Sequence, residues 1–160
     1  MLDIPFYKQD NRYTCGPAVL QMAFAYFGKK LAEGELALRL NVTEDGASHE
    51  EMIKLANNEG FFVYADNEST FDEIRYFIGL KKPVIVNFIE PSNDEGHYAV
   101  VKEVTDHSII LNDPWNGENF KMTQKDFENR WSSEDAKNKR WIMALSKEEF
   151  VLGKQFKPTD

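Results

Sequence analysis

The chain has 160 residues and a mass of 18.5 kDa, which suits a single domain with one hydrophobic core. Hydrophobic residues make up 42% of it and charged residues 29%, proportions that are ordinary for a globular protein and exclude a disordered chain. The 27 acidic residues exceed the 19 basic ones, for a net charge of -8, so we expect no nucleic-acid partner, because a phosphate backbone would be repelled, whereas a basic peptide substrate would not.

The first predicted helix carries the residue of greatest chemical interest. Residues Cys15–Phe27 are apolar on most faces, as in a helix buried at the centre of a domain. Pro17 lies in the first turn, where its missing N–H costs nothing, and Gly28 ends the helix. Thr14 or Cys15 is expected to cap it, which places the cysteine at the N-terminus of the helix.

Four more helices are predicted from shorter patterns. An amphipathic stretch predicts a helix at Glu33–Leu40. Capping boxes of the Ser-x-x-Glu and Thr-x-x-Glu types predict helices at Ser48–Asn58 and Thr70–Ile78, and a capping threonine predicts one at Thr123–Trp131.

Strand-like runs are rich in Val, Ile and aromatic residues. They are Phe61–Ala65, Pro83–Ile89, His97–Val104, Ser108–Asp113 and Arg140–Leu145. Because helices dominate the first half of the chain and strands the second, we predict an α+β fold in which an N-terminal helical part packs on a C-terminal antiparallel β-sheet.

The chain shows no internal linker or repeat. We therefore assign residues 1–146 to one domain and residues 147–160 to a polar C-terminal tail that we expect to be loosely held. No stretch reaches the roughly 18 apolar residues of a membrane span. Residues Met1–Phe6 lack the basic and apolar segments of a signal peptide, so we expect a cytoplasmic protein, or an extracellular or cell-surface one if a signal has been removed.

Cys15 is the only cysteine, which excludes an intramolecular disulfide and any site that needs two thiolates. A lone cysteine is usually a small buried hydrophobic residue and less often a nucleophile. Here the helix N-terminus carries about half a positive charge, which favours the thiolate over the thiol. Gly16 is expected to leave room beside the sulfur for a substrate, and a backbone N–H nearby can donate to an oxyanion.

Three other residues can supply the remaining parts of a hydrolytic site. Gln9, six residues before the cysteine, can donate its side-chain amide to an oxyanion, although most loop glutamines are simply solvated. His97 begins an apolar strand and can exchange a proton with a thiol, although a core histidine would also fit there. Asp113 can orient that imidazole, although Asn112-Asp113-Pro114 is also a common turn sequence.

His97 and Asp113 are expected to lie close together, because their strands form a hairpin with a tight turn at Asp106 and His107. His97 starts one strand and Asp113 ends the other, so both lie at the same end of the antiparallel pair. Each of these signals is weak alone. Together, and in this chain order, they favour a nucleophile, a base, an orienting acid and an oxyanion donor.

Four motifs resemble a known family: Ile4-Pro5-Phe6-Tyr7-Lys8-Gln9, Thr14-Cys15-Gly16-Pro17-Ala18, Gly96-His97-Tyr98-Ala99-Val100-Val101 and Asn112-Asp113-Pro114-Trp115. In order and spacing, over nearly the whole chain, they are similar to the bacteriocin-processing peptidases, which are family thirty-nine of the papain-like cysteine peptidases, and in particular to its stand-alone members. The resemblance implies a papain-like fold with the active site between a helical part and an antiparallel sheet. It also implies a peptide or protein substrate and no cofactor.

By the same resemblance, Cys15 would be the nucleophile of a cysteine endopeptidase, His97 its general base and acid, Asp113 the orienting partner and Gln9 the oxyanion donor. The best-known members are transporter domains that cut leader peptides after a Gly-Gly pair. This chain has no membrane segment and no Walker-type G-x-x-x-x-G-K-[ST] loop, so maturation coupled to transport is not expected. A leader-type peptide, another peptide, or another amide or thioester stays open as the substrate.

Two alternatives also stay open. A catalytically silent peptide-binding module on the same scaffold would keep the cleft without turnover, although the four competent residues argue against it. A structural domain would make the set accidental, in which case Cys15 and His97 would lie more than ~10 Å apart.

Two further candidates are set aside at this point. His49, Glu50 and Glu51 do not have the spacing of an H-E-x-x-H site and are better explained by a helix start, so no metal site is predicted. Trp115 could line the site next to Asp113, but a large aromatic residue after a turn is expected to pack against the core.

Overall fold

The computed structural model describes residues 1–158. Its helices and strands are, in chain order, α1 (Cys15–Tyr26), α2 (Glu33–Arg39), α3 (His49–Asn58), β1 (Phe62–Asp66), α4 (Phe71–Gly79), β2 (Val84–Ile89), β3 (Gly96–Val104), β4 (Ser108–Asp113), β5 (Gly117–Thr123), α5 (Gln124–Arg130) and β6 (Ile142–Ser146).

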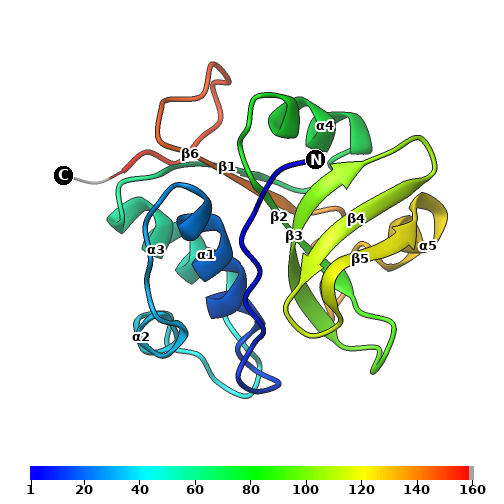
Figure 1. Cartoon of the computed structure of the whole chain (residues 1–160), viewed down its shortest axis with the longest axis horizontal. Helices are drawn as coiled ribbons and strands as arrows, with labels where there is room; N and C mark the ends of the chain where they lie inside the picture. Colours follow the sequence, from blue (N-terminus) through cyan, green and yellow to red (C-terminus); the bar gives the residue numbers. More distant parts are fainter. Residues whose placement is uncertain (159–160) are drawn as a thin grey trace.

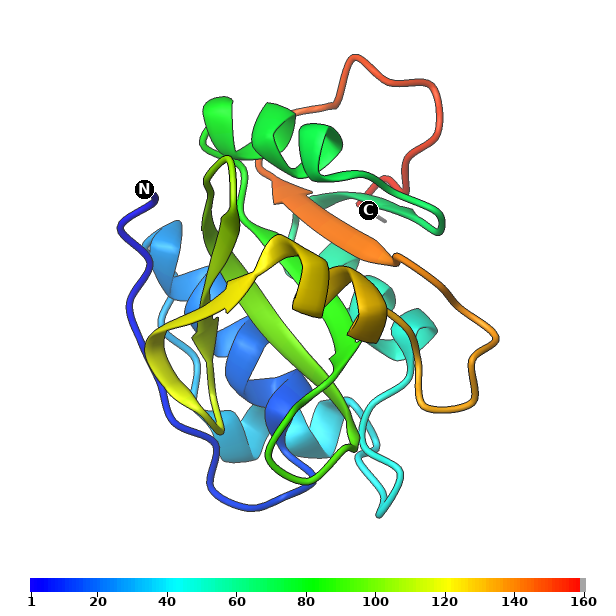
Figure 2. The same cartoon turned by 90° about the vertical axis from the view of Figure 1, so that its right-hand side faces the viewer.

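The strands of the described chain form one antiparallel sheet with the order β1-β6-β2-β3-β4-β5. Helices α1, α2 and α3 lie on one face of it, whereas α4 and α5 lie on the other (Figures 1 and 2). Strand β1 pairs with β6, so the helical first half of the chain also contributes a strand to the sheet. The predicted α+β fold, with an N-terminal helical part packed on an antiparallel sheet, is confirmed.

A hydrophobic core on each face of the sheet holds these layers together. Along β2, Ile85 belongs to the core on the α1 side, whereas Val84 and Val86 belong to the core on the α4 and α5 side, because successive side chains of a strand point to opposite faces. Leu20 and Phe24 of α1 have no exposed surface, and burying a side chain of this size contributes about 1.5–3 kcal/mol. The core therefore holds α1, and with it the cysteine at its first turn, in a fixed position.

The predicted helix caps have different outcomes. Ser48, Thr70 and Thr123 each accept a hydrogen bond from the N–H three residues further on, at 3.1 to 3.2 Å, and are confirmed as N-caps. Thr14 occupies the N-cap position of α1, but its hydroxyl is bonded to the backbone of Asn11 instead. The first turn of α1 therefore has no side chain bound to its N–H groups.

Strand β5 has no counterpart in the predicted elements. It pairs with β4 at the edge of the sheet, and its apolar residues are Phe120 and Met122, which alternate with the polar Asn119, Lys121 and Thr123. Two apolar residues are too short an alternation to predict a strand, and an edge strand with one neighbour needs little more.

The C-terminal tail is not loosely held over the residues that the structure describes, so that expectation is wrong. Phe150 is buried among the residues of the α4 side. The backbone of Phe156 exchanges two hydrogen bonds with Val63 of β1, at 2.7 and 2.9 Å. The tail thus returns along the outer edge of the sheet, where it satisfies backbone groups that an edge strand would otherwise leave open.

Candidate active site

Cys15 is the first residue of α1 and lines a cleft that also contains His97. The sulfur lies at the end of the helix whose N–H groups have no side-chain cap. These groups and the positive end of the helix dipole favour an anion here, either a thiolate or an oxyanion beside it. Gly16 does not leave open space as expected, because a Cβ atom on it would lie 2.9 Å from Cβ of Ala47. The glycine lets the wall of the cleft approach the nucleophile closely.

The expected pairing of His97 with Asp113 is present. Strands β3 and β4 form the antiparallel hairpin, with Val100 opposite Asn112. Nε2 of His97 donates to Oδ1 of Asp113 at 2.6 Å, and both side chains are buried. Because Asp113 occupies Nε2, the other ring nitrogen, Nδ1, is the one that remains for a thiol.

Asp113 is held as a carboxylate by several donors. Its Oδ1 also accepts the backbone N–H groups of Trp115 and Asn116, at 2.9 and 3.0 Å, and Oδ2 accepts Nδ2 of Asn116 at 3.0 Å. Burial raises the pKa of Asp113, but the hydrogen bonds and the charge of His97 outweigh it and leave the pKa below its ordinary value. The group that orients the imidazole is therefore ionised at neutral pH.

The same contacts explain the protonation of His97. Burial lowers its pKa, but hydrogen bonds with Asp113 and Cys15, together with the charges of both groups, raise it to about 10. At neutral pH the ring is thus an imidazolium beside the sulfur. A cation in this position stabilises a thiolate, which is the nucleophilic form of cysteine.

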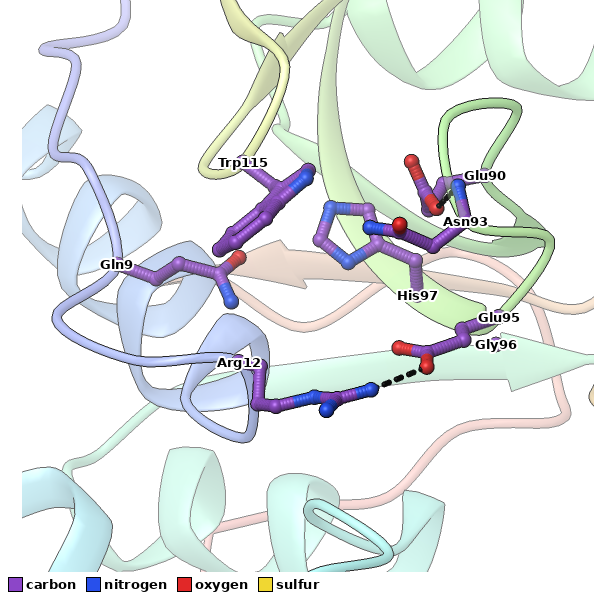
Figure 3. A pocket seen from close by; sticks show the side chains of 8 residues that line it. All are labelled: Gln9, Arg12, Glu90, Asn93, Glu95, Gly96, His97 and Trp115. Carbon is purple, nitrogen blue, oxygen red and sulfur yellow. Dashed lines mark hydrogen bonds and ion pairs between the residues drawn. The ribbon is translucent and has the colours of Figure 1, made fainter.

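Gln9 lines a small cavity together with His97. Its backbone N–H donates to the carbonyl of Pro114 at 3.0 Å, which fixes the N-terminal segment beside the turn after β4. The side chain is 5% exposed, Nε2 donates to the carbonyl of Asn11 at 2.7 Å, and Oε1 is buried without a hydrogen-bond partner among the described residues. Figure 3 shows the amide pointing into the space between Trp115 and His97.

The cleft has a volume of about 810 Å³ and lies between residues 44–50 on the helical side and the sheet. Tyr98 joins the two walls, because its hydroxyl donates to the carbonyl of Ala47 at 2.9 Å. Burial, with the charges of Cys15 and Glu50, raises the pKa of Tyr98 well above its ordinary value. The phenol therefore stays neutral and keeps donating to the opposite wall.

Trp115 does not pack against the core, so the interpretation favoured from the sequence is wrong. The side chain is 42% exposed and lines a second cavity of about 240 Å³ beside His97 and Gln9 (Figure 3). The turn is drawn inward by its N–H bond to Asp113, which leaves the indole at the surface. An aromatic wall of this kind can hold the apolar part of a bound peptide.

His49 has a larger part in the cleft than its position at a helix start indicates. Its ring stacks on Trp141 with centroids 3.8 Å apart, and Nε2 lies 3.1 Å from Oδ1 of Asn87. Nδ2 of Asn87 in turn donates to the carbonyl of His97 at 3.0 Å. Burial lowers the pKa of His49 below its ordinary value. The one sequence signal for this network is Asn87 itself, a lone polar residue within the apolar run Val84–Ile89.

Glu33, the first residue of α2, is a buried acid that the sequence did not single out. Its Oε2 accepts the backbone N–H of Asp10 at 2.9 Å, and Oε1 is buried without a hydrogen-bond partner among residues 1–158. Burial and the nearby carboxyl of Asp10 raise the pKa of Glu33 to about 7. This carboxyl braces the segment that carries Gln9 and leads into Cys15.

Replacement of Glu33 by Gln is expected to change how stability depends on pH. A carboxyl whose pKa rises from 4.5 in the unfolded chain to about 7 in the folded one binds an extra proton on folding between those values. Its contribution is therefore complete below pH 4.5 and lost as pH rises through 7. The side chain introduced by Glu33→Gln stays neutral at every pH. Between pH 4.5 and about 7 we therefore expect the free energy of unfolding of Glu33→Gln to rise by about 2 kcal/mol relative to that of the native protein. Urea unfolding at a series of pH values measures the difference.

The matched control is Glu35→Gln, which removes a carboxyl from the exposed side of the same helix. It should follow the native curve. Parallel curves for the native protein and Glu33→Gln would show that Glu33 titrates as an ordinary glutamate.

Of the four residues singled out in the sequence, Cys15 and His97 line the cleft, and Gln9 lines the smaller cavity that shares His97 with it. Asp113 is buried and reaches the site through its hydrogen bond with His97. Within residues 1–158, no group of three or more His, Cys, Asp or Glu side chains has an arrangement that could hold a metal ion. No helix within residues 1–158 is long and apolar enough to cross a bilayer.

The sequence model of the Peptidase C39 family matches residues 3–135. The chain belongs to this family. The resemblance seen in the motifs is thereby confirmed, and the protein is a member of a cysteine peptidase family. No match is found among curated proteins.

Solved C39 structures share the fold. The peptidase domain of Streptococcus ComA, a bi-functional ABC transporter, is 20% identical with a TM-score of 0.73, over 89% of this chain and 98% of that one. A C39-like peptidase from Bacillus anthracis is 14% identical with a TM-score of 0.77, over 94% and 98%. A double glycine motif protease from an AMS/PCAT transporter, in complex with its leader peptide, is 20% identical with a TM-score of 0.69, over 90% and 91%. The papain-like fold of this C39 member is thus confirmed.

Proposed function

We propose that this chain is a thiol-dependent endopeptidase in which Cys15 is the nucleophile, His97 the general base and acid, Asp113 the orienting carboxylate and Gln9 an oxyanion donor. The observation that carries the proposal is the buried 2.6 Å contact between His97 and Asp113, in a ring whose pKa is raised to about 10 by Asp113 and by Cys15. A histidine held in this way is a cation positioned to support a thiolate.

In the first half of the reaction, the thiolate of Cys15 attacks the carbonyl carbon of the scissile peptide bond and a C–S bond forms. The negative charge moves to the carbonyl oxygen, where the free hydrogen of the Gln9 amide and the backbone N–H at the start of α1 can donate to it. The imidazolium of His97 then gives its proton to the departing nitrogen, the C–N bond breaks and a thioester remains.

In the second half, His97 is neutral and accepts a proton from water, whose oxygen attacks the thioester carbon. The C–S bond breaks, the new carboxylic acid leaves, and the thiolate–imidazolium pair is restored. Asp113 stays ionised throughout, because the N–H groups of Trp115 and Asn116 donate to its carboxylate even while His97 is neutral.

We further propose a leader-type peptide with small residues at the cleavage site as the substrate. Each wall packs tightly at a glycine next to a proposed catalytic residue: a Cβ atom on Gly96 would lie 3.0 Å from Cβ of Glu134, and one on Gly16 would lie 2.9 Å from Cβ of Ala47. Such tight packing beside Cys15 and His97 favours a small residue in the substrate there. The AMS/PCAT relative, a double glycine motif protease, is bound to a leader peptide.

One observation favours a second candidate, a silent peptide-binding module on the same scaffold. The side-chain amide of Gln9 already donates to the carbonyl of Asn11 at 2.7 Å. With the amide engaged in this way, a peptide could bind in the cleft without an oxyanion donor in place.

Mass spectrometry of a synthetic leader peptide separates the two candidates. We expect the native protein to convert a Gly-Gly peptide into two fragments whose summed mass exceeds the peptide by one water. The matched control is the same peptide with Val-Val at the cleavage site, which should be cut at least about 100-fold more slowly if the site admits only small residues. Binding of the Gly-Gly peptide without fragments would favour the silent module.

A further inference from the structure

Negative charge is concentrated in the cleft. Of the 27 acidic residues in the chain, six line it, against one of the 19 basic residues. The acidic ones are Glu44, Asp45, Glu50, Glu95, Glu134 and Asp135, and the basic one is Arg12. At the chain's ratio of 27 acidic to 19 basic residues, seven charged residues would include about four acidic ones, so the cleft is more acidic than the chain as a whole.

The carboxylates come from opposite walls. Glu44 and Asp45 belong to the connection before α3 and Glu50 to its first turn, all on the helical side. Glu134 and Asp135 belong to the connection between α5 and β6, on the sheet side. A peptide that runs along the cleft past Cys15 therefore passes between two acidic surfaces, which focus a negative potential on the space that separates them.

Most of these charges are not neutralised. Within residues 1–158, Glu95 is the one member of the set with a basic side chain within 4.0 Å. Glu134 accepts the backbone N–H of Gly96 at 3.2 Å, and Asp135 accepts the hydroxyl of Ser133 at 2.7 Å. These hydrogen bonds fix the carboxylates in place while leaving their charge free to attract a cation.

The chain's own cation shows that such a group fits. The guanidinium of Arg12 lies 2.5 Å from Glu95, and Figure 3 shows this pair below the ring of His97. The pair is half-exposed, with 59% and 40% of the two side chains accessible, so a second cation can exchange with it at low cost. A guanidinium or ammonium beside the catalytic histidine is thus already compatible with the shape of the cleft.

A separate feature indicates a polar ligand in the adjoining cavity. The Oε1 atom of Gln9 is buried without a partner among the described residues, in a side chain that is 5% exposed and points toward His97 (Figure 3). A buried acceptor of this kind costs free energy until a donor reaches it. The backbone N–H of a bound peptide would supply that donor.

Resting on the proposed peptidase function, we propose that the cleft selects peptides that carry lysine or arginine within a few residues of the cleavage site, and that the carboxylates of both walls receive this side chain. Each carboxylate is exposed and contributes little alone. Several acting together raise the association rate and exclude acidic peptides by repulsion. The selectivity should therefore weaken as salt screens the charges.

Matched fluorogenic peptides test the proposal. Each has the same Gly-Gly core and differs only in carrying Lys, Ala or Glu at one position near the core, scanned along the peptide. We expect kcat/KM to be about 10- to 100-fold higher for Lys than for Glu at low ionic strength at one or more positions, and the ratio to fall in high salt. Ratios within about twofold at every position would overturn the proposal, because steering by several charges exceeds that.

Charge variants locate the effect. Glu44→Gln with Asp45→Asn removes two charges from the helical wall, neither of which forms an ion pair with another side chain of residues 1–158, and should reduce the preference for Lys several-fold. The control is Glu35→Gln with Glu148→Gln, which removes two exposed charges away from the cleft. Equal behaviour of the two double variants would mean that net charge alone sets the preference, and would overturn the role of the cleft.

A binding measurement keeps this proposal separate from the proposed activity. In the Cys15→Ala protein, fluorescence anisotropy with the dye-labelled Lys and Glu peptides reports affinity without turnover. Tighter binding of Lys than Glu, lost in the cleft variant, supports the proposal even if no peptide is ever hydrolysed by the native protein. Hydrolysis of all peptides at equal rates, with equal affinities, would leave the peptidase function intact and overturn the selectivity.

Discussion

Replacement of Cys15 by Ala is expected to lower kcat/KM for peptide hydrolysis by at least about 10⁴-fold, because no other group of the cleft can form the thioester. Residual turnover would come only from binding and from the oxyanion donors, which act without a nucleophile. The assay is initial-rate hydrolysis of the best fluorogenic Gly-Gly peptide. Activity within tenfold of the native protein would exclude Cys15 as the nucleophile.

The fold should survive this substitution. Cys15 is a small side chain at a helix start, and α1 is held by buried residues such as Leu20 and Phe24 further along it. Loss of one sulfur atom from such a site costs about 1 kcal/mol. Urea unfolding should therefore give a free energy close to that of the native protein. Cys15→Ser is the matched control, because it replaces the thiol by a hydroxyl of similar size and should be similarly inactive, since serine is the weaker nucleophile.

The central part of this site could be predicted from sequence, because it depends on local patterns. The apolar run after Cys15 specifies a buried helix, and the cysteine must then stand at its start. The hairpin after His97 has a short turn, so its length alone sets Asp113 at the same end as the histidine. Each inference needs only the periodicity of one element and the direction of the next.

The remaining parts depend on contacts between segments distant in sequence. His49 acquires its surroundings from Trp141 and Asn87, which belong to other elements. Glu33 becomes an acid with a raised pKa only because α2 packs against the segment around Asp10. No periodicity in one segment contains that information, because burial and the approach of a second carboxyl are properties of the folded chain.

Trp115 illustrates a different limit. The rule that large aromatic residues pack inside describes how much area they bury, but here the backbone N–H of this residue is required by Asp113. The carboxylate fixes the turn, and the turn leaves the indole exposed beside His97. A local hydrogen bond thus outweighs the hydrophobic preference of the side chain, at a place where an exposed aromatic surface can serve binding.

Replacement of His97 by Ala is expected to slow alkylation of Cys15 about 100-fold near pH 6.5. An isolated thiol is about 1% thiolate two pH units below its usual pKa of about 8.5, whereas a thiol paired with an imidazolium is mostly ionised. The raised pKa of His97, about 10, means that the ring keeps its proton across the neutral range and supports the thiolate there. Because Cys15 is the only cysteine, intact mass after iodoacetamide treatment reports its reaction directly.

The full pH profile tests the ion pair more strictly than one rate does. The native protein should react faster than His97→Ala wherever His97 keeps its proton, and the difference should shrink as pH rises toward the raised pKa of His97, about 10. His107→Ala, at the exposed turn of the same hairpin, should match the native protein. His97→Asn offers a second variant that can keep a hydrogen bond to Asp113 if the alanine change disturbs folding. If the native profile itself rises only near pH 8.5, the thiolate–imidazolium pair does not form in the free protein, and the silent binding module becomes the better description.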